Sequence, residues 1–112
     1  MHTTLIVTHF VPGSQEHIAR LFAESDETEL PHLIGVRSRR LFTFHDVYIH
    51  MVQADRPVAE GLSEHHDSTR FQQLSKALDA YIIPFENKWG SVQQASAQQF
   101  YHWDRDRGLI QP

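Results

Sequence analysis

The sequence contains no cysteine among its 112 residues. This absence excludes disulfides, thiolate nucleophiles and cysteine-ligated metals, and it agrees with a reducing compartment. No apolar run is long enough to cross a membrane, and the short run near the first residue lacks the basic segment of a signal peptide. We therefore expect a cytoplasmic protein that makes no membrane contact.

Charge of one sign is not concentrated in any segment. Ten basic and 14 acidic residues give a net charge of −4, so we expect no nucleic-acid partner. The sequence has no glycine-rich phosphate loop and no GxSxG elbow, and nucleotide cofactors and serine-type acyl transfer are therefore unsupported. With no linker or repeat, the chain predicts one domain over residues 1–103 and a loose C-terminal tail over 104–112.

Strand and helix patterns alternate along the chain. Segments 5–10, 34–44, 47–54 and 97–103 predict strands, because they carry β-branched or aromatic residues or alternate in polarity. One helix is predicted after Ser14 and ends before Pro31, and a second begins near Pro57 and is broken near His65 and His66. The order is the split βαβ pattern of ferredoxin-like α+β domains, with an antiparallel four-stranded sheet and helices on one face. A second copy of the chain is the simplest cover for the open face, so we expect a homodimer.

The first predicted helix carries an acid on its apolar stripe. Asp26 follows Phe22 by four residues and Ile18 by eight, so it should face the sheet, and Ser25 lies beside it. An ionisable group at a buried position is costly unless it is paired or used in chemistry. Asp26 is thus a candidate catalytic group, and pairing with a basic residue or capping of a turn is the structural alternative.

His45 and Asp46 predict a tight turn that sets the pairing of two strands. Counting back from a two-residue turn places Leu41 opposite His50, Arg39 opposite Val52 and Thr43 opposite Tyr48, all on one face. Arg39 and His50 are then diagonal neighbours with backbones roughly 7–8 Å apart, and they converge with Asp26 on one helix–sheet cleft. A solvated edge for Arg39 and a hydrogen-bonded core position for His50 are the structural alternatives.

The remaining signals are weaker. His65, His66 and Asp67 are adjacent and diverge on a helix, and no HExxH spacing is present, so we expect no metal site. Trp89 is typical of a core or dimer-interface residue, although an aromatic wall would also suit a planar ligand.

The segment 22–55, FAESDETELPHLIGVRSRRLFTFHDVYIHMVQAD, resembles the signature of the tetracenomycin F2 cyclase family of polyketide cyclases. The likeness continues to FYHW at 100–103. It implies a dimeric α+β barrel of ferredoxin-like subunits with no metal or organic cofactor. It also implies a lyase-type enzyme of type II polyketide synthesis, which closes a ring of an aromatic polyketide intermediate by aldol condensation and dehydration. Ser25 stands where the family pattern has histidine, and Arg40 where it usually has an apolar residue.

Aldol closure needs a base, a donor for the enolate oxygen and an acid, and residues of this segment suit these roles. His50 would transfer protons, since an unperturbed imidazole titrates near pH 6.5, and Arg39 would stabilise the enolate oxygen. Asp26 would orient one of them or act as the base. The expected substrate-binding residues are Ser25, Phe22, Leu41, Tyr48 and Trp89. The expected partners are the polyketide and other synthase subunits, including an acyl carrier protein.

Two other functions are compatible with these residues. One is a cofactor-independent monooxygenase of an aromatic polyketide, which would use a similar dimeric barrel. The other is a non-catalytic subunit of the synthase that binds the polyketide and steers its cyclisation.

Overall fold

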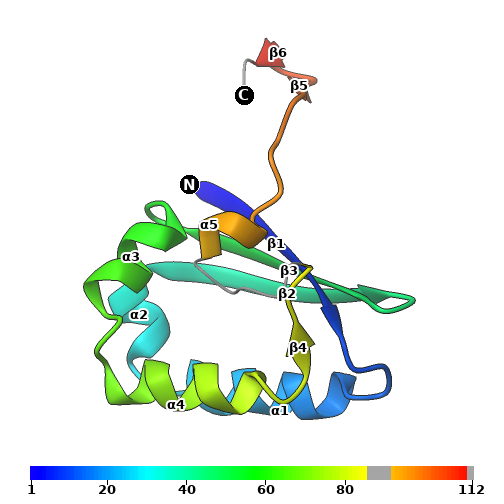
Figure 1. The fold of residues 1–112 in the computed structure, drawn as a ribbon. Coiled ribbons are helices and arrows are strands. Elements are labelled where there is room, and N and C mark those ends of the chain that lie inside the picture. The colour runs from blue at the N-terminus through cyan, green and yellow to red at the C-terminus, as the bar shows by residue number, and fades with distance from the viewer. Residues whose placement is uncertain (86–91, 111–112) are drawn as a thin grey trace.

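The computed structural model describes residues 1–85 and 92–110, and its body is an antiparallel sheet with helices packed against it (Figure 1). The strands are β1 (His2–Phe10), β2 (Val36–Phe44), β3 (Val47–Ala54) and β4 (Ile82–Ile83), in the order β2-β3-β1-β4. Each neighbouring pair is antiparallel. This confirms the ferredoxin-like α+β class that the sequence predicts.

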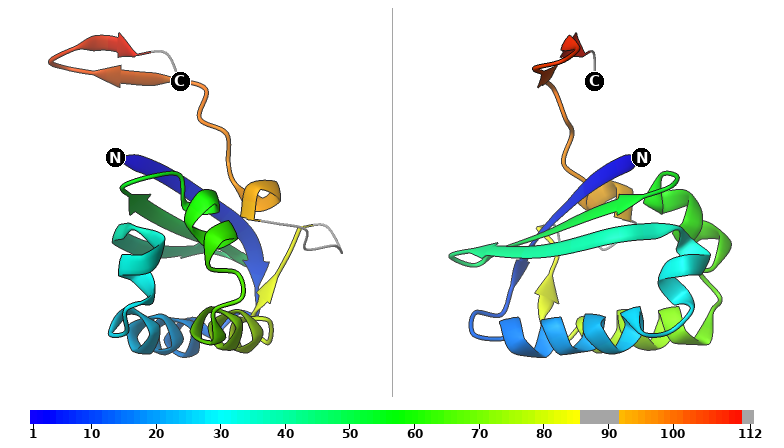
Figure 2. Two further views of the ribbon diagram at one scale, coloured as in Figure 1. Left: turned by 90° about the vertical axis from the view of Figure 1, so that its left-hand side faces the viewer. Right: turned by 180° about the vertical axis from the view of Figure 1, so that it is seen from behind.

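Two helices, α1 (Gln15–Asp26) and α4 (Thr69–Leu78), lie side by side against one face of the sheet (Figure 2). The α1 helix forms after a left-handed turn at Gly13, and it buries Ile18 and Phe22, which are four residues apart. Ser14 is its N-cap residue, as expected, but the Ser14 hydroxyl donates to the carbonyl of Val11 at 2.6 Å instead of capping the helix. The predicted stripe therefore faces the sheet.

A short helix, α2 (Leu30–Ile34), precedes β2 and was not predicted from the sequence. Pro31 lies in its first turn, where proline loses no helical hydrogen bond. The helix ends at Gly35, whose φ of 93° allows its N–H to donate to the carbonyl of Pro31 at 2.9 Å. The predicted strand start at Ile34 was therefore wrong, and β2 begins at Val36.

The second helical stretch is broken as predicted. It consists of α3 (Val58–Glu64) and α4, and Ser68 caps α4 by accepting the N–H of Phe71 at 3.4 Å. Helix α3 packs so closely on α2 that a Cβ atom at Gly61 would overlap the backbone and side chain of Ile34. Gly61 is thus required by packing rather than by a turn.

The prediction that 97–103 forms the last strand of the sheet was wrong. After α5 (Val92–Ala95), Ser96 bridges to Ile6 and the N–H of Ala97 donates to the carbonyl of Leu5 at 2.7 Å, and then the chain leaves the sheet. The strands β5 (His102–Asp104) and β6 (Gly108–Ile110) form a separate hairpin away from the body (Figures 1 and 2). Residues 104–110, expected to be a loose tail, therefore belong to this hairpin. Ala-Gln-Gln at 97–99 offers little apolar surface to hold the segment on the sheet.

Two buried clusters form the core. One contains Ile6, Leu30, Ile34, Val52 and Val58. The other contains Phe10, Ile18, Phe22 and Tyr48. Both clusters supply walls of the cavity described next.

Candidate active site

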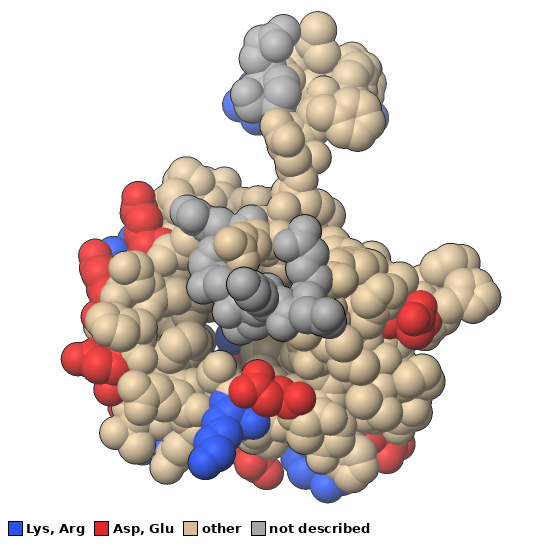
Figure 3. All heavy atoms as spheres, viewed as in Figure 1, with Lys and Arg blue, Asp and Glu red and all other residues tan. Residues whose placement is uncertain are grey.

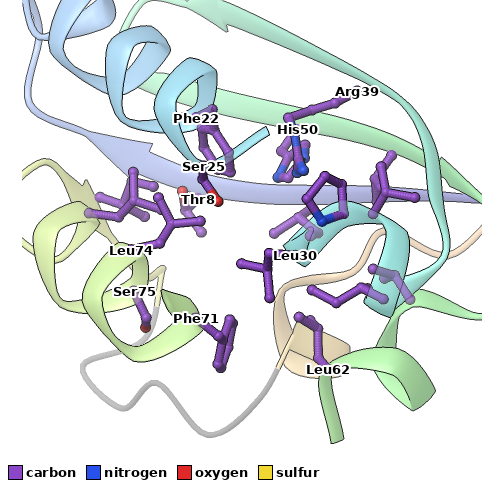
Figure 4. A pocket seen from close by; sticks show the side chains of 18 of the residues that line it. Thr8, Phe22, Ser25, Leu30, Arg39, His50, Leu62, Phe71, Leu74 and Ser75 are labelled. Atoms are coloured by element: carbon purple, nitrogen blue, oxygen red, sulfur yellow. The ribbon is translucent and has the colours of Figure 1, made fainter. Parts of the chain in front are cut away.

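A cavity of about 470 Å³ lies between the inner face of the sheet and the helices. Figure 4 shows Phe22 and Ser25 from α1 and Leu74 and Ser75 from α4 around it, with His50 on the sheet. Most of its wall is apolar, and its polar groups are few. Such a cavity is typical of a site for an apolar small molecule that a few polar groups orient.

The hairpin that carries the candidate residues pairs as the sequence predicts. Phe44 pairs with Val47, Leu41 with His50, and Arg39 lies opposite Val52. The turn residue His45 adopts a φ of 54°. Because side chains alternate along a strand, Arg39 and His50 both point to the inner face and line the cavity.

Arg39 is held by a two-pronged ion pair with Asp26. The Nε atom donates to Oδ2 at 2.9 Å, and Nη2 donates to Oδ1 at 2.7 Å. The guanidinium also lies over the ring of Phe22, with Cζ 4.7 Å from the ring centroid. The Arg39 side chain is 15% exposed and that of Asp26 is 36% exposed. Asp26 therefore lies nearer to solvent than its helical spacing suggests, and it holds Arg39 in place.

His50 is in contact with Arg39 rather than with an acid. Nη1 of Arg39 lies 3.0 Å from Nε2 of His50, and a guanidinium can only donate, so Nε2 accepts. In the neutral imidazole the proton is then on Nδ1. His50 is 8% exposed, and its ring meets that of Phe22 edge to face, with centroids 5.1 Å apart.

The surroundings of His50 disfavour its charged form. Burial, and then the positive charge of Arg39, lower the pKa of His50 to about 3. The expected titration near pH 6.5 is thus moved well below neutrality. His50 is neutral in the free protein at pH 7.

Tyr48 lies two residues before His50 on β3 and faces the same cavity. Burial raises the pKa of Tyr48, and the charge of Arg39 opposes this effect only in part. The phenol therefore keeps its proton and can donate a hydrogen bond.

Only some of the other predicted site residues line the cavity. Phe22 and Ser25 line the cavity, as expected. Leu41 packs against the core cluster that contains Tyr48. Among the described residues, neither Leu41 nor Asp26 belongs to the cavity wall. Trp89 lies outside the residues that the structure describes.

Three polar residues of the cavity wall were missed by the sequence analysis. Thr8 comes from β1, Ser75 comes from α4, and Asp79 is the C-cap residue of α4. A signal for Thr8 was present, because it alternates with Ile6 and Phe10 on the inward face of the first strand. Ser75 and Asp79 are four residues apart and follow the apolar stripe of α4.

Within residues 1–85 and 92–110, no group of three or more His, Asp or Glu side chains is placed to hold a metal ion. In the same part of the chain, no helix has the length and apolar character needed to span a membrane.

The fold and the site define a small α+β protein of the ferredoxin-like class, with an acid, a guanidinium and an imidazole connected beside one apolar cavity. The chain belongs to the polyketide synthesis cyclase family, whose family model matches residues 2–104. This confirms the family to which segment 22–55 points.

Two named relatives show the extent of the similarity. Tetracenomycin F2 cyclase of Streptomyces glaucescens is 38% identical over 102 residues, which cover 91% of this chain and 94% of that protein. Polyketide synthase CurG of Streptomyces cyaneus is 38% identical over 107 residues, covering 95% and 100%. The solved structure of the S. glaucescens tetracenomycin F2 cyclase, described as a type-II polyketide cyclase, matches 93% of this chain and 98% of its own with a TM-score of 0.84.

Proposed function

We propose that this polyketide cyclase closes a ring of an aromatic type II polyketide intermediate by aldol condensation followed by loss of water. The hydrogen-bonded series of Asp26, Arg39 and His50 beside the 470 Å³ cavity carries the proposal. An apolar cavity of this size suits a polycyclic ligand, and the family membership indicates the class of that ligand.

Arg39 is the proposed oxyanion donor. Aldol closure removes a proton from a carbon beside a carbonyl group and places negative charge on the enolate oxygen. A guanidinium has five N–H donors; two are given to Asp26 and one to His50, which leaves two for a substrate oxygen. A positive charge on a largely apolar wall stabilises that oxygen.

His50 is the proposed proton carrier. In the free protein its Nε2 lone pair accepts from Arg39, so His50 is a poor base there. When Arg39 turns toward a carbonyl oxygen of the substrate, the lone pair is released, and the negative charge that develops on this oxygen during proton transfer offsets the guanidinium. We expect the pKa of His50 to rise in the complex, so that Nε2 accepts the carbon-bound proton. The enolate carbon then bonds to a second carbonyl carbon, and His50 returns its proton to the new alkoxide, which becomes a hydroxyl. For dehydration, His50 removes a second proton from the former enolate carbon and gives it to this hydroxyl, which leaves as water while a carbon–carbon double bond forms.

The substitutions His50→Gln and Arg39→Met test these roles. We expect each to slow ring closure about a hundredfold or more, or to divert it to another product, because one proton carrier or one oxyanion donor is lost. The measurement is product formation from a poly-β-ketone substrate, followed by chromatography. Arg37→Met is the matched control, since Arg37 lies two residues away on β2 and pairs with Asp55 at the surface. Unchanged turnover and product in both site variants would remove the assigned roles.

Oxygen consumption separates the cyclase from a cofactor-independent monooxygenase. Aldol closure and dehydration release water and consume no oxygen. Stoichiometric oxygen uptake during product formation would therefore contradict the proposal.

A non-catalytic steering subunit is the second candidate function, and one observation favours it. The Nε2 lone pair of His50 already accepts a hydrogen bond from Arg39, so it is not free to take a proton from a substrate. A steering protein would leave total product formation unchanged in His50→Gln when the synthase is reconstituted. If the protein instead catalyses ring closure, His50→Gln should lose formation of the wild-type product.

We also propose that two copies of the chain assemble through the outer face of the sheet. Phe42 and Phe44 on that face are 48% and 69% exposed. The C-terminal segment exposes Phe100 and Trp103 to 88% and 56%. Exposed aromatic surface of this kind is typical of an interface. A synthase subunit such as a carrier protein stays a further proposed partner. Acidic and basic side chains are mixed on the described part of the face in Figure 3, so charge alone does not mark a docking patch for it there.

A further inference from the structure

Two hydroxyl groups of the cavity wall have no hydrogen-bond partner within the described part of the chain. They are Oγ1 of Thr8 and Oη of Tyr48. Thr8 is 1% exposed and Tyr48 is 2% exposed, and both residues line the cavity. The two residues are direct cross-strand partners on β1 and β3, so their side chains leave the sheet side by side.

An unpartnered buried hydroxyl is unusual. The large majority of buried polar side-chain atoms in proteins are hydrogen-bonded, because burial without a partner is costly. Valine at position 8 and phenylalanine at position 48 would fill nearly the same space without this cost. Two such hydroxyls on paired residues of one cavity wall therefore suggest that a ligand atom completes them.

We propose that Thr8 and Tyr48 form a second polar subsite, which binds one oxygen atom of the aromatic polyketide and thereby selects the substrate carbon that lies beside His50. The inference rests on the proposed function for the identity of the ligand. Tyr48 and His50 project from the same face of β3 with ring centroids 6.4 Å apart, so an oxygen held by Tyr48 lies at a set distance from the reacting group.

The chemistry of a polyketide makes such a subsite selective. A poly-β-ketone carries oxygen on every second carbon, so an oxygen held in the subsite determines whether a carbonyl carbon or the proton-bearing carbon between two carbonyls lies beside His50. Both hydroxyls donate and accept, and they therefore bind either a carbonyl or a phenolic oxygen. A buried hydroxyl that stays unpaired disfavours a ligand that lacks the matching oxygen.

Binding of two probes tests the subsite without turnover. The probes are 1,8-dihydroxyanthraquinone and its hydroxyl-free parent, anthraquinone, titrated against the full chain by isothermal titration calorimetry. We expect the wild type to prefer the hydroxylated probe. Thr8→Val and Tyr48→Phe should each reduce this preference by about 3- to 10-fold, the usual effect of one hydrogen bond, and Thr8→Ser should retain it.

Thr43→Val is the matched control. Thr43 flanks Tyr48 from the other neighbouring strand, but its side chain is exposed. It should leave the preference unchanged. Thermal unfolding separates binding from structure, because loss of an unpartnered hydroxyl should leave the melting temperature of Thr8→Val equal or higher. A lower melting temperature with an unchanged preference would overturn the inference.

The subsite and the proposed reaction fail in different ways. A wild type that does not distinguish the two probes overturns the subsite, whether or not ring closure occurs. A wild type that distinguishes them, but forms no ring from a poly-β-ketone, overturns the reaction and supports the subsite. With active protein, a ratio of ring-closure products that changes in Thr8→Val but not in Thr43→Val supports selection of the substrate carbon.

Discussion

Among single residues, Arg39 connects the parts of the candidate site. It binds Asp26 through two hydrogen bonds, contacts Nε2 of His50, and lies over the ring of Phe22. Its positive charge adds to the effect of burial in lowering the pKa of His50, and it opposes in part the effect of burial, which raises the pKa of Tyr48. The protonation of the cavity wall therefore depends on where this one guanidinium lies.

The lowered pKa of His50 predicts a pH-dependent stability. The pKa is about 3 in the folded protein, against about 6.5 in an unfolded chain. Between these values the unfolded state binds more protons, so the contribution of His50 to the free energy of unfolding is complete above pH 6.5. It is lost as the pH falls toward 3, by up to about 1.4 kcal/mol per pH unit.

Denaturant unfolding of the wild type and His50→Gln at pH 7, 6 and 5 measures this effect. The stability of the wild type relative to the variant should decrease as the pH falls. His17→Gln, at an exposed histidine of α1, is the control and should follow the wild type. Parallel pH curves for the wild type and His50→Gln would contradict the lowered pKa.

The positions of Arg39 and His50 could be predicted from sequence, but their interaction could not. A two-residue turn sets the strand pairing, and pairing sets which side chains share a face. The partner of Asp26 depends on how α1 crosses the sheet, and the pKa of His50 depends on burial by residues from several elements. Neither follows from the spacing of residues along the chain.

Among the helices and strands, the close packing of α3 on α2 could not be predicted from helix propensity alone. Gly61 is inside a helix, where alanine is normally more favourable by about 1 kcal/mol. Here a Cβ atom would overlap the backbone of Ile34. Packing and propensity therefore act in opposite directions at this residue.

We expect Gly61→Ala to lower the free energy of unfolding by about 1–3 kcal/mol, because overpacking outweighs the gain in helix propensity. Ser63→Ala, at an exposed position of the same helix, should be neutral or slightly stabilising. Urea unfolding of the two variants measures the difference. A Gly61→Ala variant more stable than the wild type would show that α2 and α3 can separate at no cost.

The elements differ in how far the sequence determines them. The hairpin and α1 follow from local patterns, since their turn residues and apolar spacing agree. The short α2 is hard to predict because a proline usually marks the end of a helical pattern, although Pro31 here fits the first turn of a helix. The wrongly predicted last strand alternates in polarity, but the sheet edge beside β1 is taken by β4 and by a single bridge at Ser96.

For the whole molecule, the distribution of exposed aromatic side chains predicts a dimer. Sedimentation equilibrium should give a mass of twice 13.0 kDa for the wild type. Phe44→Glu and Trp103→Glu place charge on the proposed interface and should shift the mass toward the monomer. Leu33→Glu alters an exposed apolar residue of α2 and should leave the mass unchanged. A monomeric wild type at micromolar concentration would contradict the proposed assembly.

The alternation along β3 separates two sets of properties within one strand. Tyr48, His50 and Val52 are buried against the cavity, whereas Ile49 and Met51 between them are half-buried on the opposite face. Substitutions at the even-numbered positions would therefore remodel ligand preference without altering the outer surface. Substitutions at the odd-numbered positions would alter solubility and assembly without entering the cavity. A directed-evolution library could thus vary specificity and surface behaviour independently, provided that the length of the turn at His45 is kept.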